Sequence, residues 1–300
     1  MRDAKSLFAS RKAIRVGLFL AQRISPRSGH ALARGIANLL AWLRPQMYWN
    51  IRANLRQILG PDTPVEVLHE TARRTLIHAG CAYYDHFHAV GGAPEELAGI
   101  LNVPELFWET LSRTQKEGRG LVLVTGHLSN FDLAALSLMV RGVRLQALSL
   151  REPTKGFQFL NQLRSAGGVE VTPITEAAIR QALRRLRQGG IVMTGVDYPT
   201  GPGHEPLNFF GRPALLPTGH VRLAMIAGAL LLVVGVVYGE ETGYALRVAP
   251  PLELIRTGNR GRDVRLNAER VLDILAGWIR EHPEQWMMFL PVWPELLERR

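Results

Sequence analysis

The chain has 300 residues, of which 47% are hydrophobic and 21% are charged. This composition is typical of globular proteins and excludes a disordered chain, and the length allows one large α/β domain or two small ones. The single cysteine, Cys81, excludes a disulfide within the chain, as expected for a reducing cytosolic compartment.

The formal net charge of +10 is concentrated in the N-terminal fifth of the chain. Residues 1–60 contain eleven Lys and Arg and one acid, Asp3, whereas the other 240 residues hold equal numbers of bases and acids. Apolar residues such as Leu18 and Leu39 recur there at helical spacing, which predicts basic amphipathic helices. Such helices suit the surface of an anionic membrane. We therefore predict that residues 1–60 associate with the membrane and belong to the same domain as an α/β core at 61–300.

Basic N-terminal regions also occur in membrane spans, transit peptides and nucleic-acid-binding proteins. A membrane span needs about 20 apolar residues, and Arg23, Arg27 and Arg34 interrupt the apolar runs. A transit peptide is disfavoured because the pattern continues to Arg56 without a cleavage-like site. Packing on the core with solvated arginines is the structural alternative. Nucleic-acid binding, suggested by a pI near 10.4, lacks a recognised motif. We expect a peripheral protein at the cytoplasmic face of the bacterial cell membrane, with no nucleic-acid partner.

Residues 62–90 predict a further helix that contains Asp85-His86-Phe87-His88. His and Asp are metal ligands, but His86 and His88 point to nearly opposite sides of a helix. We therefore expect a partly buried polar cluster there and no metal site.

From residue 120 onward, short apolar runs alternate with amphipathic segments. Strands are predicted at 121–124, 143–150, 169–172, 191–196, 230–238 and 244–248, and helices from 129 and at 155–166, 176–187, 218–227 and 264–280. The pattern predicts an α/β fold with a mostly parallel central sheet flanked by helices on both faces, the last strand being antiparallel.

A candidate active site lies where the first of these strands ends. His127 follows Thr125-Gly126, Ser129 and Asn130 are good N-cap residues, and Asp132 falls in the first helical turn. Because the chain turns before the helix, the Asp132 carboxylate can approach one ring nitrogen of His127 and leave the other facing a cleft. A histidine oriented by a carboxylate can take a proton from a hydroxyl. The alternative is an ordinary loop histidine beside a capping acid.

His127, four residues and then Asp132, after an apolar strand, resemble the HX4D motif of the glycerolipid and lysophospholipid acyltransferase superfamily. Further blocks follow in the family's order: Arg151-x-Pro153 with Asn161 and Arg164, Gly-Val-Asp197-Tyr-Pro, Asn208-Phe-Phe-Gly-Arg212-Pro, Pro217-Thr-Gly219 and Arg280-Glu-His-Pro-Glu-Gln-Trp286. The chain is most similar to the branch of bacterial lipid A late acyltransferases and phosphatidylinositol mannoside acyltransferases. The lipid A enzymes commonly have Glu where this chain has Asp132, and they carry an N-terminal membrane span that we do not expect here. Both differences make the chain more similar to the mannoside acyltransferases.

The resemblance implies an O-acyltransferase that moves a fatty acyl group from acyl-CoA or acyl carrier protein to a hydroxyl of a glycolipid or lysophospholipid. His127 is then the general base and Asp132 its orienting acid, without a covalent intermediate, metal or bound cofactor. The candidate substrate-binding residues are Arg151, Asn161, Arg164, Asp197 and Arg212. Each of these five is also compatible with a purely structural role, and a lipid hydrolase with the same His–Asp pair is an alternative. His127, Arg151 and Asp197 follow strands of a parallel sheet, at the edge where ligands bind.

Overall fold

Seven strands form one sheet in the order β1-β9-β8-β2-β5-β3-β4. The computed structural model describes residues 11–297 except 91, 152, 154, 200 and 202, so Arg2, Asp3 and Lys5 of the basic region lie outside the described residues. The strands are β1 (Leu101–Asn102), β2 (Leu121–Thr125), β3 (Leu145–Ser149), β4 (Glu170–Pro173), β5 (Ile191–Gly195), β8 (Leu230–Gly239) and β9 (Gly243–Val248). Neighbouring strands run parallel except β8 and β9. The predicted α/β fold with its mostly parallel sheet is confirmed.

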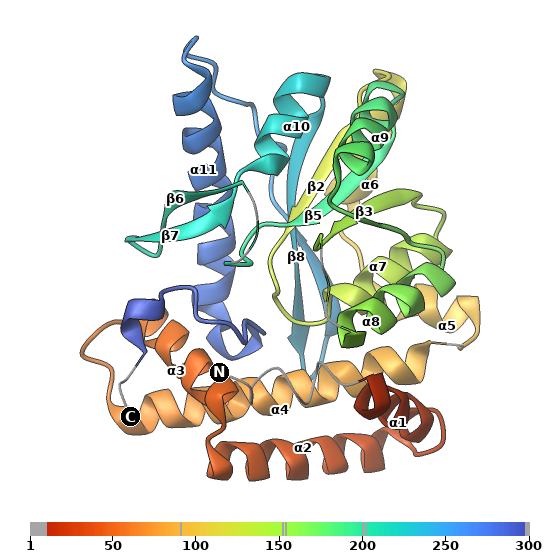
Figure 1. Ribbon diagram of the computed structural model, residues 1–300. Helices are drawn as coiled ribbons and strands as arrows, with labels where there is room; N and C mark the ends of the chain where they lie inside the picture. The colour runs from red at the N-terminus through yellow and green to blue at the C-terminus, as the bar shows by residue number, and fades with distance from the viewer. Residues whose placement is uncertain are drawn as a thin grey trace.

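Strand β2 lies at the centre of the sheet, and its five residues are all buried. Its alternate side chains point to opposite faces, as they must on a strand. Val122 and Val124 join one hydrophobic cluster, and Leu121 and Leu123 join another. The first cluster includes side chains of α9 (Glu176–Arg187), α10 (Gly219–Ala227) and α11 (Arg260–Glu281). The second includes side chains of α6 (Glu105–Lys116) and α7 (Phe131–Val140). Helices therefore cover both faces, as Figure 1 shows.

The N-terminal helices form a separate layer at one end of the sheet. Helix α4 (Val65–Ala89) runs across that end, α2 (Pro26–Leu43) lies along its outer side, and α1 (Arg11–Ala21) and α3 (Gln46–Leu59) flank it (Figure 1). Helix α4 also contacts the segment that follows β2: His78 Nε2 lies 3.0 Å from Ser129 Oγ, and Asn130 donates to the Ala82 carbonyl at 2.8 Å. Across the described helices, none combines the length and apolar character needed to cross a membrane.

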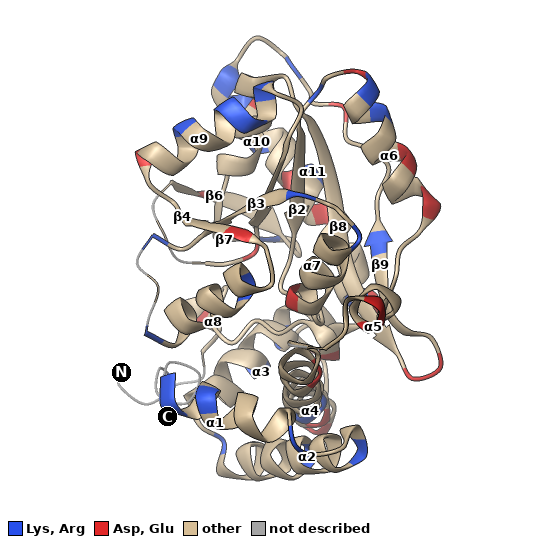
Figure 2. Ribbon diagram, turned by 90° about the vertical axis from the view of Figure 1, so that its right-hand side faces the viewer, with Lys and Arg blue, Asp and Glu red and all other residues tan. Residues whose placement is uncertain are grey.

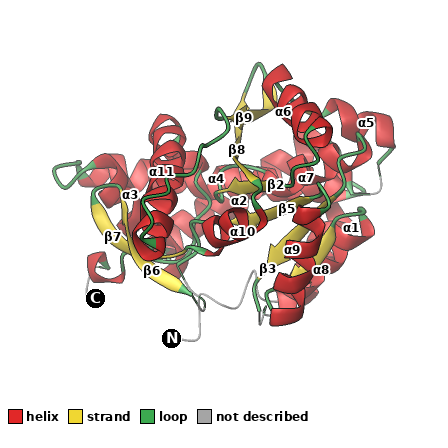
Figure 3. Ribbon diagram, turned by 90° about the horizontal axis from the view of Figure 1, so that it is seen from above, coloured by secondary structure: helices red, strands yellow, loops and turns green. Residues whose placement is uncertain are grey.

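The structure also contains elements that the periodicity did not predict. A hairpin pairs β6 (His204–Phe209) with β7 (Arg212–Pro217) in antiparallel register and lies beside α11 (Figure 3). Its two turn residues, Phe210 and Gly211, both have positive φ, the conformation of a type I′ hairpin turn. Short helices that were not predicted also occur at α5 (Pro94–Gly99), η1 (Pro283–Gln285) and η2 (Pro294–Leu296). Helix α8, in contrast, spans Lys155–Ala166 as predicted.

Candidate active site

Strand register brings His127 and Asp197 together. Thr125 at the end of β2 pairs with Gly195 at the end of the neighbouring parallel strand β5, and His127 and Asp197 each follow by two residues. The His127 Nδ1 atom lies 2.7 Å from Asp197 Oδ1, and the His127 backbone N–H donates to Oδ2 at 2.7 Å. The indole Nε1–H of Trp286 donates to the same Oδ2 at 2.8 Å. Asp197, which is fully buried, therefore has both oxygens engaged.

The two partners shift each other's titration. Burial raises the pKa of Asp197, but the nearby His127 and the hydrogen bonds outweigh it and hold the pKa below its ordinary value. For His127 burial has the opposite effect and lowers the pKa, whereas the charge and hydrogen bond of Asp197 raise it. The net shift of the His127 pKa is upward. An ionised carboxylate accepts only, so neutral His127 carries its proton on Nδ1 and has its lone pair on Nε2.

Aromatic rings and the C-terminal segment fix this histidine. Phe131 stands edge-on to the imidazole at 5.2 Å between ring centroids, and Tyr198 lies 5.6 Å away. The His127 carbonyl accepts from the Met287 N–H at 2.8 Å. About a quarter (26%) of the His127 side chain is exposed, so solvent and substrate can reach it.

Asp132 occupies a different position from the one predicted. Its carboxylate forms a two-pronged ion pair with Arg164 of α8, with Nε–Oδ1 at 2.7 Å and Nη2–Oδ2 at 2.9 Å. Asp197 fills the place beside His127 Nδ1 that the HX4D motif predicted for Asp132, because the end of β5 is closer to the imidazole than the first turn of α7 is. Asp132 still acts on His127 through its charge, which raises the pKa of the imidazole after the larger effects of burial and Asp197.

Two predicted substrate-binding residues belong to this ion-pair cluster. Asn161 accepts from Arg164 Nη1 at 2.6 Å and donates to Ser149 Oγ at 2.9 Å. The nearby His86 lines a small cavity with Asp132, and neither of its buried ring nitrogens has a hydrogen-bond partner among the described residues. Burial lowers the pKa of His86, so it is neutral beside the pair. The cluster thus ties β3, α7 and α8 together behind the catalytic turn.

The other predicted residues lie outside this cluster. Arg151 is exposed just after β3. Arg212 on β7 donates to Gln57 of α3 at 3.0 Å and lies 3.4 Å from Glu295, so it links three segments of the fold. His88 contacts the Ala21 carbonyl through Nδ1 at 2.6 Å. In the described part of the chain, no group of three or more His, Cys, Asp or Glu is placed to hold a metal ion.

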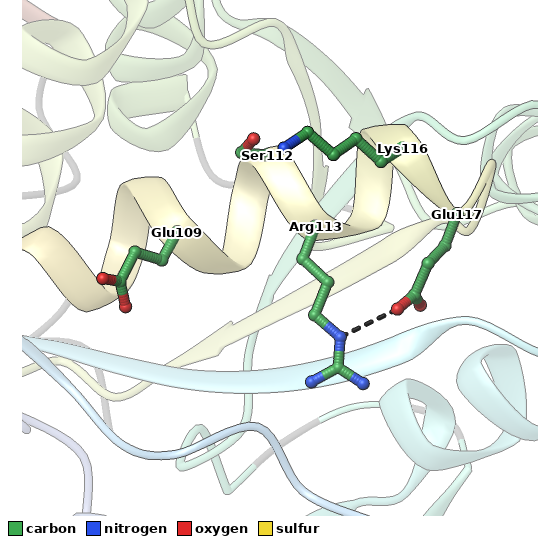
Figure 4. Close-up of a pocket in the computed structure, with 5 residues that line it drawn as sticks. All are labelled: Glu109, Ser112, Arg113, Lys116 and Glu117. Carbon is green, nitrogen blue, oxygen red and sulfur yellow. Dashed lines mark hydrogen bonds and ion pairs between the residues drawn. The ribbon is translucent and has the colours of Figure 1, made fainter.

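A second hollow lies along α6 (Figure 4). Its lining consists of Glu109, Ser112, Arg113, Lys116 and Glu117, and Arg113 Nε donates to Glu117 at 2.8 Å. Because α6 leads into the start of β2, this hollow lies at the edge of the sheet opposite His127. Its solvated charges carry no apparent chemistry.

The sequence patterns predict neither Trp286 as a donor to Asp197 nor Asp197 as the partner of His127. The pair of His127 and Asp197 could have been predicted from position, because each residue follows the end of its strand by two residues. Trp286 belongs to the last of the family blocks, but that block predicts no contact with Asp197. Trp286 reaches the site through an isolated antiparallel bridge to Leu128 from a segment remote in sequence.

Comparison with known proteins places the chain in a family. The family model described as bacterial lipid A biosynthesis acyltransferase matches residues 10–295. A phosphatidylinositol mannoside acyltransferase of Mycobacterium tuberculosis is 28% identical over 180 residues, which cover 59% of this chain and 55% of that protein, about half its length. Its namesake in Mycolicibacterium smegmatis is 24% identical over 250 residues, 81% of this chain and 78% of the relative. The chain belongs to the bacterial lipid A biosynthesis acyltransferase family.

Proposed function

We propose that this protein is an O-acyltransferase that moves a fatty acyl group from acyl-CoA or acyl carrier protein to a hydroxyl of a glycolipid or lysophospholipid. The observation that carries the proposal is the partly exposed His127, whose Nδ1 is held by the buried Asp197 at 2.7 Å. This leaves the lone pair of Nε2 to act as a base.

In the proposed reaction, Nε2 of His127 takes the proton of the acceptor hydroxyl while the hydroxyl oxygen attacks the thioester carbonyl carbon. Asp197 stabilises the imidazolium that forms. The tetrahedral intermediate then expels the thiolate, which takes the proton back from Nε2, so the products are an ester and a free thiol. Direct attack is favoured over an acyl-enzyme because the hydroxyl on this turn, Ser129 Oγ, is fully buried, so a thioester cannot reach it.

The family and the names of the relatives favour a glycolipid as the acceptor. The acceptor class and the basic N-terminal region together support a peripheral enzyme at the cytoplasmic face of the cell membrane. No metal or bound cofactor is required by the proposed steps. Asp132 and Arg164 support the site in this scheme rather than touching the reacting atoms.

The test supplies radiolabelled acyl-CoA, or acyl carrier protein, with a bacterial lipid extract and identifies the labelled product. An acylated lipid is expected, and His127→Ala should lower its formation about 10²–10⁴-fold. The matched control is His69→Ala. This histidine lies outside the site, where its Nδ1 is 2.8 Å from the Tyr48 hydroxyl. Free fatty acid formed at the same rate with and without the lipid would instead identify a hydrolase.

A further inference from the structure

Helix α2 presents most of its large apolar side chains to solvent and its small ones to the protein. Its inner residues Gly29, Ala37 and Ala41 are buried against the core. A side chain at Gly29 would collide with the ring of Tyr84 on α4, which shows how closely the two helices pack. Amphipathic helices of globular proteins ordinarily turn their large apolar residues to the core, so α2 is oriented the opposite way.

Helices α1 and α2 are neighbours at one end of the molecule (Figures 1 and 2), and we call their exposed apolar residues the outer face. It consists of Val16, Phe19, Leu20, Leu32, Ile36, Leu39, Trp42 and Leu43, whose exposed fractions run from 37% to 77%. These are eight of the fourteen exposed large hydrophobic residues in the described part of the chain. Apolar patches of this kind on a protein surface mark a partner rather than contact with water.

The charges around the outer face identify the kind of partner. Residues 11–60 contain nine Lys and Arg and no acidic residue. Those on α1, α2 and their connections are exposed, and Figure 2 shows them beside these helices. Arg23 lies over the ring of Phe19 at 3.7 Å, so a cation borders the apolar surface directly. A second copy of this chain would bring the same positive charges together, whereas an anionic bilayer offers both an apolar interior and neutralising headgroups.

We infer that the outer face of α1 and α2 inserts into an anionic lipid bilayer, with Trp42 as its most exposed member and the flanking arginines at the headgroups. The inference rests on the proposed function for its expectation that the acceptor lies in a membrane. Helix α4 lies between this surface and the catalytic turn, since it packs against α2 and its His78 contacts Ser129. Docking therefore seats the end of the molecule that carries His127 towards the lipid (Figure 1).

The test measures partition of the full chain onto phosphatidylglycerol and phosphatidylcholine vesicles. Leu39→Glu with Leu43→Glu should weaken binding to the anionic vesicles at least tenfold. The matched control is Leu215→Glu with Ile255→Glu, at two exposed apolar residues outside α1 and α2, and should change binding less than twofold. Substituting Arg11 or Arg15 is less clean, because both stack on Phe159 of α8 at 5.7 and 5.6 Å and their loss would disturb packing.

Fluorescence gives an independent readout, because Trp42 is the exposed one of the six tryptophans, all of which lie in the described part of the chain. Brominated lipid should quench wild-type emission, and Trp42→Phe should remove most of that quenching. Equal binding by the two double variants overturns the inference, as does wild-type binding that ignores lipid charge and salt. A dimer that the outer-face variant abolishes, with no vesicle binding, would identify an interface between copies instead. Wild-type activity on a soluble short-chain acceptor separates the two proposals. If this activity is absent, the acyltransferase proposal is wrong, whereas the inference that the outer face inserts into a bilayer is unaffected.

Discussion

Two carboxylates lie near His127, the fully buried Asp197 and the largely buried Asp132, and they have different kinds of partner. Asp197, two residues past β5, faces the titratable imidazole of His127. Asp132, in the first turn of α7, faces the guanidinium of Arg164, which is charged at every relevant pH. The charge of Asp132 is therefore already neutralised before any reaction. That of Asp197 is available to stabilise an imidazolium when His127 takes a proton.

The difference between the two carboxylates separates chemistry from support. Asp197 holds the tautomer of the base and gains a stronger partner as the base becomes charged. Asp132 joins α7 to α8, together with Asn161, and influences His127 only through space. Substitutions on the two sides should therefore differ in whether they alter turnover or stability.

Of the substitutions that distinguish the two carboxylates, Asp197→Asn is expected to have the largest effect on turnover. The amide presents an N–H or a single oxygen where the carboxylate accepted from Nδ1, which removes the charge and weakens the tautomer preference. Turnover on a soluble acceptor should fall about 10²–10⁴-fold, while circular dichroism stays native. A folded Asp197→Asn enzyme with near-normal turnover would remove Asp197 from the mechanism.

On the other side, Asp132→Asn should act chiefly on stability. It leaves the Arg164 guanidinium buried without its carboxylate, which typically costs about 3–5 kcal/mol. Urea unfolding should show this loss, and adding Arg164→Met should recover much of it, because an apolar replacement removes the unpaired charge. The loss of turnover should be smaller than for Asp197→Asn. If Asp132→Asn unfolds like the wild type yet loses as much turnover, the two assignments are reversed.

The pH dependence of kcat/KM should rank the two carboxylates. The pKa of His127 is raised above its ordinary 6.5, so activity should rise with pH through a limb above that value as the base loses its proton. Asp197→Asn leaves the burial and removes the charge, so the limb should move to lower pH. Asp132→Asn should move it in the same direction by less. Equal displacement by both variants would contradict the ranking.

The smallest expected change is that of Trp286→Phe. It removes one donor to Asp197 Oδ2 while keeping an aromatic ring. A hydrogen bond to a charged group contributes about 1.5–3 kcal/mol to the free energy of unfolding. The carboxylate then carries more uncompensated charge, so the limb of the pH profile should move to higher pH, opposite to Asp197→Asn. An unmoved limb in Trp286→Phe would mean that Trp286 acts through packing alone.

Much of the fold was predictable because β2 and β8 are unbroken apolar runs with clear boundaries, while α8 and α9 show helical periodicity. The β6–β7 hairpin was not, since its buried residues, such as Leu207 and Phe209, alternate in a short segment rich in proline and glycine. The site was predictable as a set of strand ends. The partner of His127 was not, because HX4D spacing places Asp132 near it in sequence while strand register places Asp197 near it in space. Likewise, periodicity predicts that α2 is amphipathic but does not tell which face meets the core.

The most direct test of the account is the protonation state of His127 itself, read from its side-chain ¹⁵N shifts across a pH titration. We expect a neutral imidazole with its proton on Nδ1 and a pKa above 6.5. We also expect Asp197→Asn to remove the Nδ1–H preference and Asp132→Asn to keep it. A neutral His127 protonated on Nε2 in the wild type, or a tautomer that follows Asp132 rather than Asp197, would contradict it.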